Sequence, residues 1–483
     1  MSVSRAALWI SIALAGCSGS TGGSASHPVP RPSPAEPGRI AILVTVDGLM
    51  PEAYTAPDEH ELAVPTLRRI VREGAWAEFA EPVMPAVTYP THTTLATGVP
   101  PSRHGIVSNR AFDPLEKNQG GWRWYAEDIR ATTLWQAAER RGKRAALLQW
   151  PVAAGARVHW LVTEYWRAKT TEDQKLVRAL STPGLLPAVT RRFPDFWDKG
   201  DYPDAELLDD RRMIDVASYL LDVGPPDLLM IHLAAVDAFE HDRGVWSGEV
   251  RSAIERMDQQ LARLIDECKK RALWPRVALF VVSDHGFAPI HSELRPAVLF
   301  REAHLIELDK ADKPISWRAG VQANGGSAYI YLADPGDQVT GRAVRALLAP
   351  YTGPGRPIKR MIDTGQIAAL GGDPTAFLAL EAADGYVFQE GVKGTWLTTP
   401  SGSRAHHGWF PDHPAMRASF LAYGPGIRPG ALGKVRLIDV APTVARWLGV
   451  ELPAATGHPI DLFGTAEISG GSENRTAPRQ FRR

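Results

Sequence analysis

The stretch Val277-Ala-Leu-Phe-Val-Val-Ser-Asp-His-Gly286 places an apolar run directly before an Asp, a His and a Gly. Two similar runs, Ile40–Val46 and Leu228–Leu233, come shortly before Asp47 and Asp237. Short aliphatic and β-branched runs of this kind are typical of buried strands in a largely parallel sheet. In open α/β sheets the ligand site lies beyond the carboxyl ends of the strands. The sequence therefore predicts a site at one edge of such a sheet.

Strand-like and helix-like segments alternate along most of the chain. This order favours an α/β fold, a doubly wound and mostly parallel sheet with helices on both faces. The 483 residues suffice for one large catalytic domain with insertions, which we place at residues 39–465. Residues 288–400 interrupt the alternation and are expected to form extra strands and a cap-like insertion. The polar tail at residues 466–483 is expected to be disordered.

Several Asp and His residues near these apolar runs are candidate metal ligands. Carboxylates and imidazoles gathered at one sheet edge would be costly to desolvate unless cations held them. Mixed His and carboxylate ligands suit two divalent ions, zinc above all. A solvated pair would show the same spacing as Asp237 and His241, and only one of His406 and His407 need be a ligand. The candidates are Asp47, Asp237, His241, Asp284, His285 and His407, whereas His104, His232 and His413 are expected to be structural or peripheral.

The segment Thr88-Tyr-Pro-Thr-His-Thr-Thr-Leu-Ala-Thr-Gly98 begins with a Thr and has a Pro shortly after it. Pro is tolerated in the first turn of a helix, so Thr88 is a candidate N-cap residue. Its hydroxyl would lie at the positive end of the helix dipole, where backbone N–H groups suit an anion. A nearby cation would lower the pKa of this hydroxyl and make it a nucleophile, and a simple capping Thr is the alternative.

The amino terminus has the pattern of an export signal. Arg5 precedes an apolar stretch, Ala6–Ala15, that is too short to span a bilayer. It ends in Leu14-Ala-Gly-Cys17, which resembles the bacterial lipobox, and a plain signal peptide is the alternative. We expect a lipoprotein signal peptide at residues 1–17 and a flexible tether at residues 18–38. The chain would then be an exported lipoprotein, anchored to the membrane through Cys17 on the periplasmic or extracytoplasmic side.

The charge balance indicates that the protein has no overall excess of positive charge to attract anionic partners. Lys+Arg and Asp+Glu both number 54, so binding of a nucleic-acid polymer is not expected and phosphate recognition must be local. Lipidation of Cys17 would leave Cys268 without an intramolecular partner. We therefore expect Cys268 to be a buried, inert thiol.

Taken in order, these motifs resemble the alkaline phosphatase superfamily, and within it the type I phosphodiesterase/nucleotide pyrophosphatase family. The resemblance runs from about Arg39 to Gly457 and includes Pro101-Ser-Arg-His-Gly-Ile106 and Ile438-Asp-Val-Ala-Pro-Thr443. It implies a small phosphate ester as the substrate and two zinc ions as cofactors. One zinc ion would be held by Asp47, Thr88, Asp284 and His285, and the other by Asp237, His241 and His407.

The resemblance also implies a mechanism in which Thr88 attacks phosphorus and forms a phospho-threonine intermediate. Thr91 stands where the family is expected to carry an Asn that donates to the phosphoryl oxygen, so Thr91 is a second candidate catalytic residue. The Trp150-Pro151 pair and the lack of a Lys-x-Arg clamp favour a diester substrate. A phosphomonoesterase or phosphonate hydrolase on the same two-metal scaffold is the alternative. A sulfatase is disfavoured because Thr cannot form the aldehyde that sulfatases need, and an inactive binding protein because every expected ligand is present.

Overall fold

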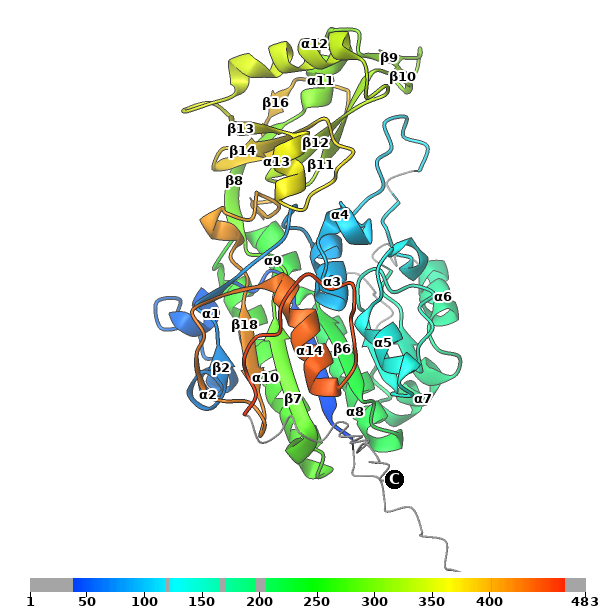
Figure 1. Ribbon diagram of the computed structural model, residues 1–483, viewed down its shortest axis with the longest axis vertical. Helices are drawn as coiled ribbons and strands as arrows, with labels where there is room; N and C mark the ends of the chain where they lie inside the picture. The colour runs from blue at the N-terminus through cyan, green and yellow to red at the C-terminus, as the bar shows by residue number, and fades with distance from the viewer. Residues whose placement is uncertain (1–37, 119–120, 166–170, 197–205, 401, 465–483) are drawn as a thin grey trace, which may run out of the picture. The chain divides into compact units, whose positions relative to one another are not determined.

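The computed structural model describes residues 38–464, apart from residues 119–120, 166–170, 197–205 and 401 (Figure 1). The expected signal peptide with Cys17, the tether as far as residue 37 and the tail at residues 466–483 lie outside the described residues. Among the helices that are described, none is both long and apolar enough to cross a membrane.

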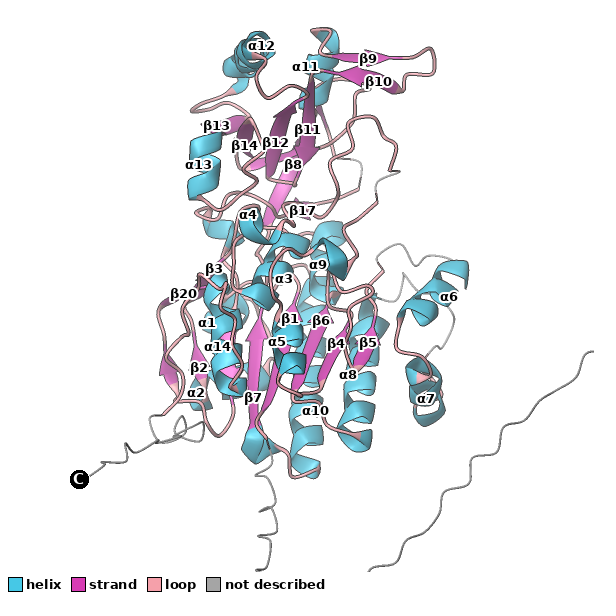
Figure 2. Cartoon of the chain, turned by 45° about the vertical axis from the view of Figure 1, so that its right-hand side comes forward, coloured by secondary structure: helices cyan, strands magenta, loops and turns pink. Residues whose placement is uncertain are grey.

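A mostly parallel sheet forms the centre of the described chain (Figure 2). Its middle strands are β7 (Val277–Val282), β1 (Ile40–Val46) and β6 (Leu228–Leu233), with the bounds that the apolar runs predict. The strand order is β19-β2-β18-β7-β1-β6-β4-β5, parallel from β7 to β5 and antiparallel between β7 and β18. The remaining strands of this sheet are β2 (Ala75–Trp76), β4 (Ala145–Leu148), β5 (Trp160–Val162), β18 (Phe420–Tyr423) and β19 (Gly430–Ala431).

Helices pack on both faces of this sheet, because successive side chains of a strand point to opposite sides. Ile42 and Val44 of β1 face one apolar core, which also contains side chains of α2 (Pro65–Glu73), α7 (Leu185–Arg192), α8 (Glu206–Val223) and α10 (Gly248–Lys270). Leu43 faces a second core with side chains of α3 (Thr88–Thr97), α5 (Leu134–Arg140) and α14 (Val440–Leu448). The doubly wound α/β fold is therefore confirmed. Cys268 in α10 is a buried free thiol, as expected.

The segment expected to form an insertion, residues 288–400, folds into further sheets with an apolar core of their own. One antiparallel sheet has the order β11-β12-β14-β13, and β8 pairs with β15, β16 and β17. The strands of the insertion are β8 (Ala288–Leu294), β9 (Ile306–Leu308), β10 (Pro314–Trp317), β11 (Ala319–Ala323), β12 (Ser327–Leu332), β13 (Ile358–Asp363), β14 (Leu378–Ala382), β15 (Gly385–Phe388) and β16 (Leu397–Thr398). The strand β17 (Ala405–His406) follows the insertion in the sequence. Its helices are α11 (Pro296–Glu302), α12 (Gln338–Leu348) and α13 (Thr364–Ala369).

Shorter elements complete the fold. β3 pairs with β20 beside the central sheet. The remaining β-strands and α-helices are β3 (Phe79–Glu81), β20 (Lys434–Arg436), α1 (Glu52–Thr55), α4 (Pro101–His104), α6 (Thr171–Leu180) and α9 (Ala235–Arg243).

The middle strands end level with one another, which sets the position of the site. In the parallel register, Thr45 of β1 lies opposite both His232 of β6 and Val282 of β7. The backbone N–H of Asp47 then donates to the carbonyl oxygen of Leu233, 2.9 Å away. Residues that follow these strands therefore meet at one edge of the sheet, as the Asp and His pattern predicts.

Candidate active site and metal centre

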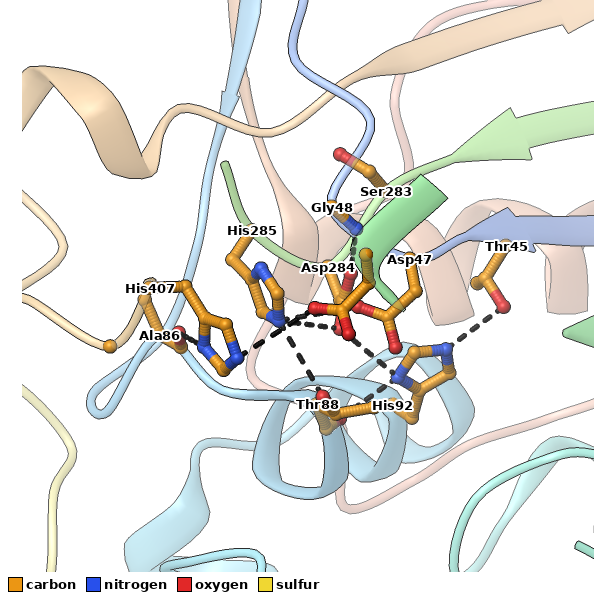
Figure 3. Close-up of polar contacts among 12 residues, drawn as sticks. Thr45, Asp47, Gly48, Ala86, Thr88, His92, Ser283, Asp284, His285 and His407 are labelled. Carbon is orange, nitrogen blue, oxygen red and sulfur yellow. Dashed lines mark hydrogen bonds and ion pairs between the residues drawn. The ribbon is translucent and has the colours of Figure 1, made fainter. Parts of the chain in front are cut away.

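Asp47, Asp284 and His285 form one group of facing ligand-type side chains (Figure 3). Nε2 of His285 lies 3.3 Å from Oδ1 of Asp47 and 3.2 Å from Oδ2 of Asp284. The N–H of Gly48 donates to Oδ1 of Asp284 at 3.2 Å, which fixes this carboxylate and leaves Oδ2 toward His285. All three ligand-type residues are buried. The three side chains have one oxygen or nitrogen atom each within reach of a single metal ion.

Asp237, His241 and His407 form a second group beside the first. Oδ1 of Asp237 lies 3.6 Å from Nε2 of His241 and 3.8 Å from Nε2 of His407. Nδ1 of His241 is 3.1 Å from the carbonyl oxygen of Ala405, and Nδ1 of His407 is 3.3 Å from that of Ala86. When Nδ1 donates to a carbonyl, Nε2 keeps its lone pair for a metal, which is the usual arrangement of a ligating His. His406 lies close to both imidazoles and is a further candidate ligand.

The charges at this site are uncompensated. Burial raises the pKa of the Asp47, Asp237 and Asp284 carboxyls, and repulsion among the carboxylates raises it further at Asp47 and Asp284. Burial lowers the pKa of His241 to about 4 and that of His285 well below its usual value. One oxygen of each carboxylate has no hydrogen-bond partner in the described part of the chain. Neutral imidazoles and unpaired carboxylate oxygens are what a divalent cation requires, so these residues fit a metal pair.

The hydroxyl of Thr88 lies next to the first group of ligand-type side chains. Its Oγ1 is 3.5 Å from Nε2 of His285 (Figure 3). The prediction that Thr88 caps α3 is wrong by one residue, because the extended residue before the helix is Val87 and Thr88 is the first helical residue. The hydroxyl of Thr88 therefore does not cap the helix and points to the ligand group instead.

His92 supports this arrangement, and the sequence analysis did not single it out. Its Nδ1 lies 2.8 Å from the carbonyl oxygen of Thr88 and 3.6 Å from Oδ2 of Asp284. Its Nε2 lies 2.9 Å from Oγ1 of Thr45 (Figure 3). One turn of helix separates Thr88 from His92, so the imidazole holds the first turn of α3 against the end of β1. In the sequence, the four-residue spacing between Thr88 and His92, which places both on one face of a helix, could have identified His92.

Both ligand groups border a cavity of about 430 Å³. Thr88, Asp47, Asp237 and His407 are among its lining residues, and so is Asn109. Oδ1 of Asn109 accepts a hydrogen bond from the backbone N–H next to Thr88, at a distance of 2.9 Å. This bond orients the carboxamide, so that its NH₂ group remains to donate to a ligand in the cavity.

The structure contradicts the prediction that Thr91 donates to the phosphoryl oxygen. Thr91 is completely buried, does not line the cavity, and its Oγ1 has no hydrogen-bond partner among the described residues. It lies almost one helical turn beyond Thr88 in α3, below the end that faces the cavity. Asn109 has a side-chain amide that could donate to a phosphoryl oxygen, which is the role predicted for Thr91. It lies in an irregular loop, where no periodic sequence pattern identifies it.

The loop that carries Asn109 is tied to the inserted sheets. Oγ of Ser108 donates to Oδ1 of Asn324 at 2.7 Å. Nε2 of Gln322, in β11, donates to the carbonyl oxygen of Arg110 at 2.6 Å. These two bonds flank Asn109, so the insertion helps to fix the position of its amide.

Two further residues belong to the site although the sequence analysis did not assign them to it. His232, expected to be structural or peripheral, lines the cavity, and its Nε2 lies 3.5 Å from Oδ2 of Asp47. Glu240 is completely buried, and neither of its carboxylate oxygens has a hydrogen-bond partner in the described chain. A Cβ on Gly48 would lie 2.8 Å from Oε2 of Glu240, so this turn at φ +74° requires glycine. The sequence signal for Glu240 was its position directly before His241.

The other two His residues have the structural roles expected of them. His104 is buried, with Nε2 3.0 Å from Oγ1 of Thr94. His413 pairs with Asp384 at 3.0 Å, and neither His104 nor His413 lines the cavity.

The doubly wound α/β sheet thus brings paired His and carboxylate groups together beside Thr88, the first residue of α3. Residues 41–347 match the type I phosphodiesterase / nucleotide pyrophosphatase family, and the chain belongs to this family. The family is part of the alkaline phosphatase superfamily and is metal-dependent.

Several known proteins are similar to this chain. An uncharacterized pyrophosphatase/phosphodiesterase of Schizosaccharomyces pombe is 27% identical over 258 residues, which cover 51% of this chain and 44% of that protein. The bis(5′-adenosyl)-triphosphatase of Xenopus laevis is 25% identical over 256 residues, covering 51% of this chain and 47% of that protein. The matched region thus spans less than half the length of these relatives.

Solved structures share the fold over more of the chain. Murine ectonucleotide pyrophosphatase/phosphodiesterase 5, an inactive variant in complex with AMP, superposes with a TM-score of 0.59 at 19% identity. The superposition covers 87% of this chain and 97% of that one. At this identity the likeness concerns the fold alone.

Proposed function

We propose that this chain hydrolyses phosphate diesters and nucleotide pyrophosphate bonds, with Thr88 as the nucleophile and a phospho-threonine intermediate. The position of Thr88 carries the proposal. Its Oγ1 lies 3.5 Å from Nε2 of His285, on the wall of the cavity and at the first residue of α3. Membership of the family supports the same reaction.

We propose zinc for both metal positions, because the ligands combine imidazole nitrogens with carboxylate oxygens. When bound, the two cations would lower the pKa of the Thr88 hydroxyl and stabilise negative charge on the reacting oxygens. The residues that would hold one ion are Asp47, Thr88, Asp284 and His285, and those that would hold the other are Asp237, His241 and His407.

The chain's own residues orient the reaction. Oγ1 of Thr88 bonds to phosphorus while the bond from phosphorus to the leaving oxygen breaks. Water then releases the phosphate-bearing product, so that a diester and one water give a monoester and an alcohol. The proton of the Thr88 hydroxyl passes to solvent, and the leaving oxygen takes one from water. The NH₂ group of Asn109 donates to a phosphoryl oxygen, and His92 holds the carbonyl of Thr88 in place.

The charges around the cavity favour a diester over a monoester. Arg110 is the one Lys or Arg among the described residues that line it, and its guanidinium lies 5.5 Å from the ring centroid of Trp122. Glu164 also lines the cavity, and above its raised pKa of about 7 its carboxylate would repel a second negative charge on the substrate. A singly charged diester therefore suits this cavity better than a dianionic monoester.

Turnover of bis-p-nitrophenyl phosphate and of p-nitrophenyl phosphate by the zinc-loaded protein tests the proposal. We expect the diester to be preferred. Thr88→Ala should lose activity about a thousandfold or more while it keeps nearly all its zinc. Thr395→Ala, at an exposed Thr far along the chain, is the matched control. A monoester preference of several orders of magnitude would contradict the diesterase proposal, and an active Thr88→Ala protein would contradict the role of Thr88.

We further propose that the chain is exported and anchored by a lipid on Cys17. The sequence Leu14-Ala-Gly-Cys17 supports this proposal. Radiolabelled palmitate should be incorporated into the wild-type chain expressed in bacteria, and Cys17→Ser should remain unlabelled and leave the membrane fraction. Equal labelling of both proteins would contradict the anchor.

A further inference from the structure

Glu164 is a buried acidic residue on the wall of the catalytic cavity, and no step of the proposed reaction uses it. It follows β5, is 8% exposed and lines the same cavity as Thr88. Its Oε2 accepts a hydrogen bond from the hydroxyl of Tyr89 at 2.6 Å. Among the described residues, the carboxylate forms no ion pair and Oε1 accepts no hydrogen bond. One acceptor oxygen is therefore left for a ligand.

The position of Glu164 relative to Thr88 indicates which part of a substrate would contact Glu164. Tyr89 follows Thr88 directly, and the tip of its side chain reaches Glu164. Glu164 is therefore joined to the segment of Thr88 through the side chain of Tyr89, and among the described residues no hydrogen bond joins it to Thr88 itself. The ring of Trp122, whose centroid lies 5.2 Å from that of Tyr89, borders the same part of the cavity. An organic substituent of the phosphate would lie here.

The chemistry of the pocket limits what this substituent can be. An ionised carboxylate accepts hydrogen bonds and repels anions, so a second phosphate is disfavoured beside Glu164. A purely apolar group would leave Oε1 buried without a partner, at a cost in free energy. Tyr89 is only 1% exposed and its ring meets that of Trp122 edge to face, so the partly exposed Trp122 is the aromatic surface beside this acceptor. An aromatic surface and a single acceptor suit a planar group with an exocyclic N–H donor.

We propose that Glu164 is a specificity-determining residue that selects nucleobases with an amino group at the position of adenine C6 or cytosine C4 over hypoxanthine and uracil, which carry an oxo group at that position. At the exocyclic position, a carboxylate accepts from the N4 amino group of cytosine but faces the O4 carbonyl oxygen of uracil, which repels it. The inference rests on the proposed function, because it assigns the organic part of the ester that Thr88 would attack.

Binding to an inactive protein tests this assignment without turnover. Zinc-loaded Thr88→Ala is titrated with AMP against IMP and with CMP against UMP in a calorimeter. Because burial raises the pKa of Glu164 to about 7, the titrations are run at alkaline pH, where the carboxylate is ionised. We expect each amino nucleotide to bind about tenfold more tightly than its oxo analogue.

The double variant Thr88→Ala/Glu164→Gln should bring this ratio to within about threefold of unity or reverse it. Gln keeps the size of Glu and an oxygen for Tyr89, but it offers an NH₂ group to the base. Glu451→Gln in the same background is the matched control, at an exposed carboxylate that pairs with Arg141. Equal binding of amino and oxo nucleotides by the parent, or a ratio that Glu164→Gln does not change, would overturn the assignment. A uniform loss on all four nucleotides would indicate a structural role and overturn it as well.

Two further substrates separate this inference from the proposed function. Bis-p-nitrophenyl phosphate has no N–H donor, so failure of the wild type to hydrolyse it rejects the proposed function, whereas the binding ratios still decide the role of Glu164. p-Nitrophenyl phosphocholine has a cation without an N–H group. If Glu164→Gln impaired its turnover more than that of nucleotide esters, Glu164 would recognise a cation and the N–H assignment would be wrong.

Discussion

The imidazole rings of His285 and His407 stack in parallel, with their centroids 3.7 Å apart and their planes 10° apart (Figure 3). His285 lies in one group with Asp47 and Asp284 and also within ligand distance of Asp237 and His407. The two candidate metal positions therefore share a wall of imidazole, and a change at either ring should be felt at both positions.

His407→Ala tests whether His407 is a ligand of the second metal position. Removal of one ligand should reduce zinc from about two ions per chain to about one, because the group around Asp237 loses an imidazole nitrogen. Diesterase activity should fall with it. Elemental analysis of the dialysed protein gives the stoichiometry. His413→Ala removes an imidazole that lies outside the cavity, and it should retain both ions. Full zinc content in His407→Ala would remove His407 from the ligand set.

Asn109 and Thr91 should respond in opposite ways to loss of their polar groups. Asn109→Ala should lower kcat about a hundredfold, because the phosphoryl oxygen loses a fixed donor. Thr91→Val should change kcat little and should not destabilise the fold, because Oγ1 of Thr91 has no hydrogen-bond partner in the described chain. Steady-state kinetics on bis-p-nitrophenyl phosphate and urea unfolding compare the two variants. A large loss of kcat in Thr91→Val with none in Asn109→Ala would restore the prediction made from sequence.

Metal removal should destabilise the protein, because Asp47, Asp237 and Asp284 are buried with unpaired oxygens. Dialysis against EDTA should lower Tm, and zinc at about a thousand times its Kd should restore about 4 kcal/mol. Differential scanning calorimetry measures both values. In Asp284→Asn the recovery on adding zinc should be smaller. Identical Tm values for the wild type with and without zinc would contradict the account of these charges.

Glu267 should contribute stability that depends on pH. Burial tends to raise its pKa, but hydrogen bonds from Lys270, Arg271 and Ser218 outweigh this and lower the pKa from 4.5 to about 2. A lowered pKa favours folding above the unfolded value, and this contribution is lost as the pH falls from 4.5 toward 2. Glu267→Gln should therefore lose stability at neutral pH and show a shallower decline in acid. Urea unfolding across this range measures both slopes, and parallel curves would reject the prediction.

Sequence patterns predicted the elements that bury all their side chains. The strands that precede Asp47, Asp237 and Asp284 have the predicted bounds, because a fully buried parallel strand is apolar from end to end. The carboxyl ends of parallel strands meet, so the neighbourhood of these carboxylates followed from the same pattern.

The remaining parts of the site depend on tertiary contacts that no local pattern records. Asn109 is fixed by a loop tied to a distant insertion, and Glu164 is reached through the side chain of Tyr89. Thr91 was misplaced because its depth in α3 depends on what packs over the helix. Glu240 stood beside His241 in the sequence, but its burial without a partner is visible only in the fold.

The central claim is that two groups of side chains hold two divalent ions beside Thr88. Anomalous diffraction at the zinc edge from crystals of the zinc-loaded protein tests it most directly. We predict two peaks, one within about 2.0–2.2 Å of ligand atoms of Asp47, Asp284 and His285, and one within the same range of Asp237, His241 and His407. No peak at either group, or zinc bound only elsewhere on the chain, would contradict the account.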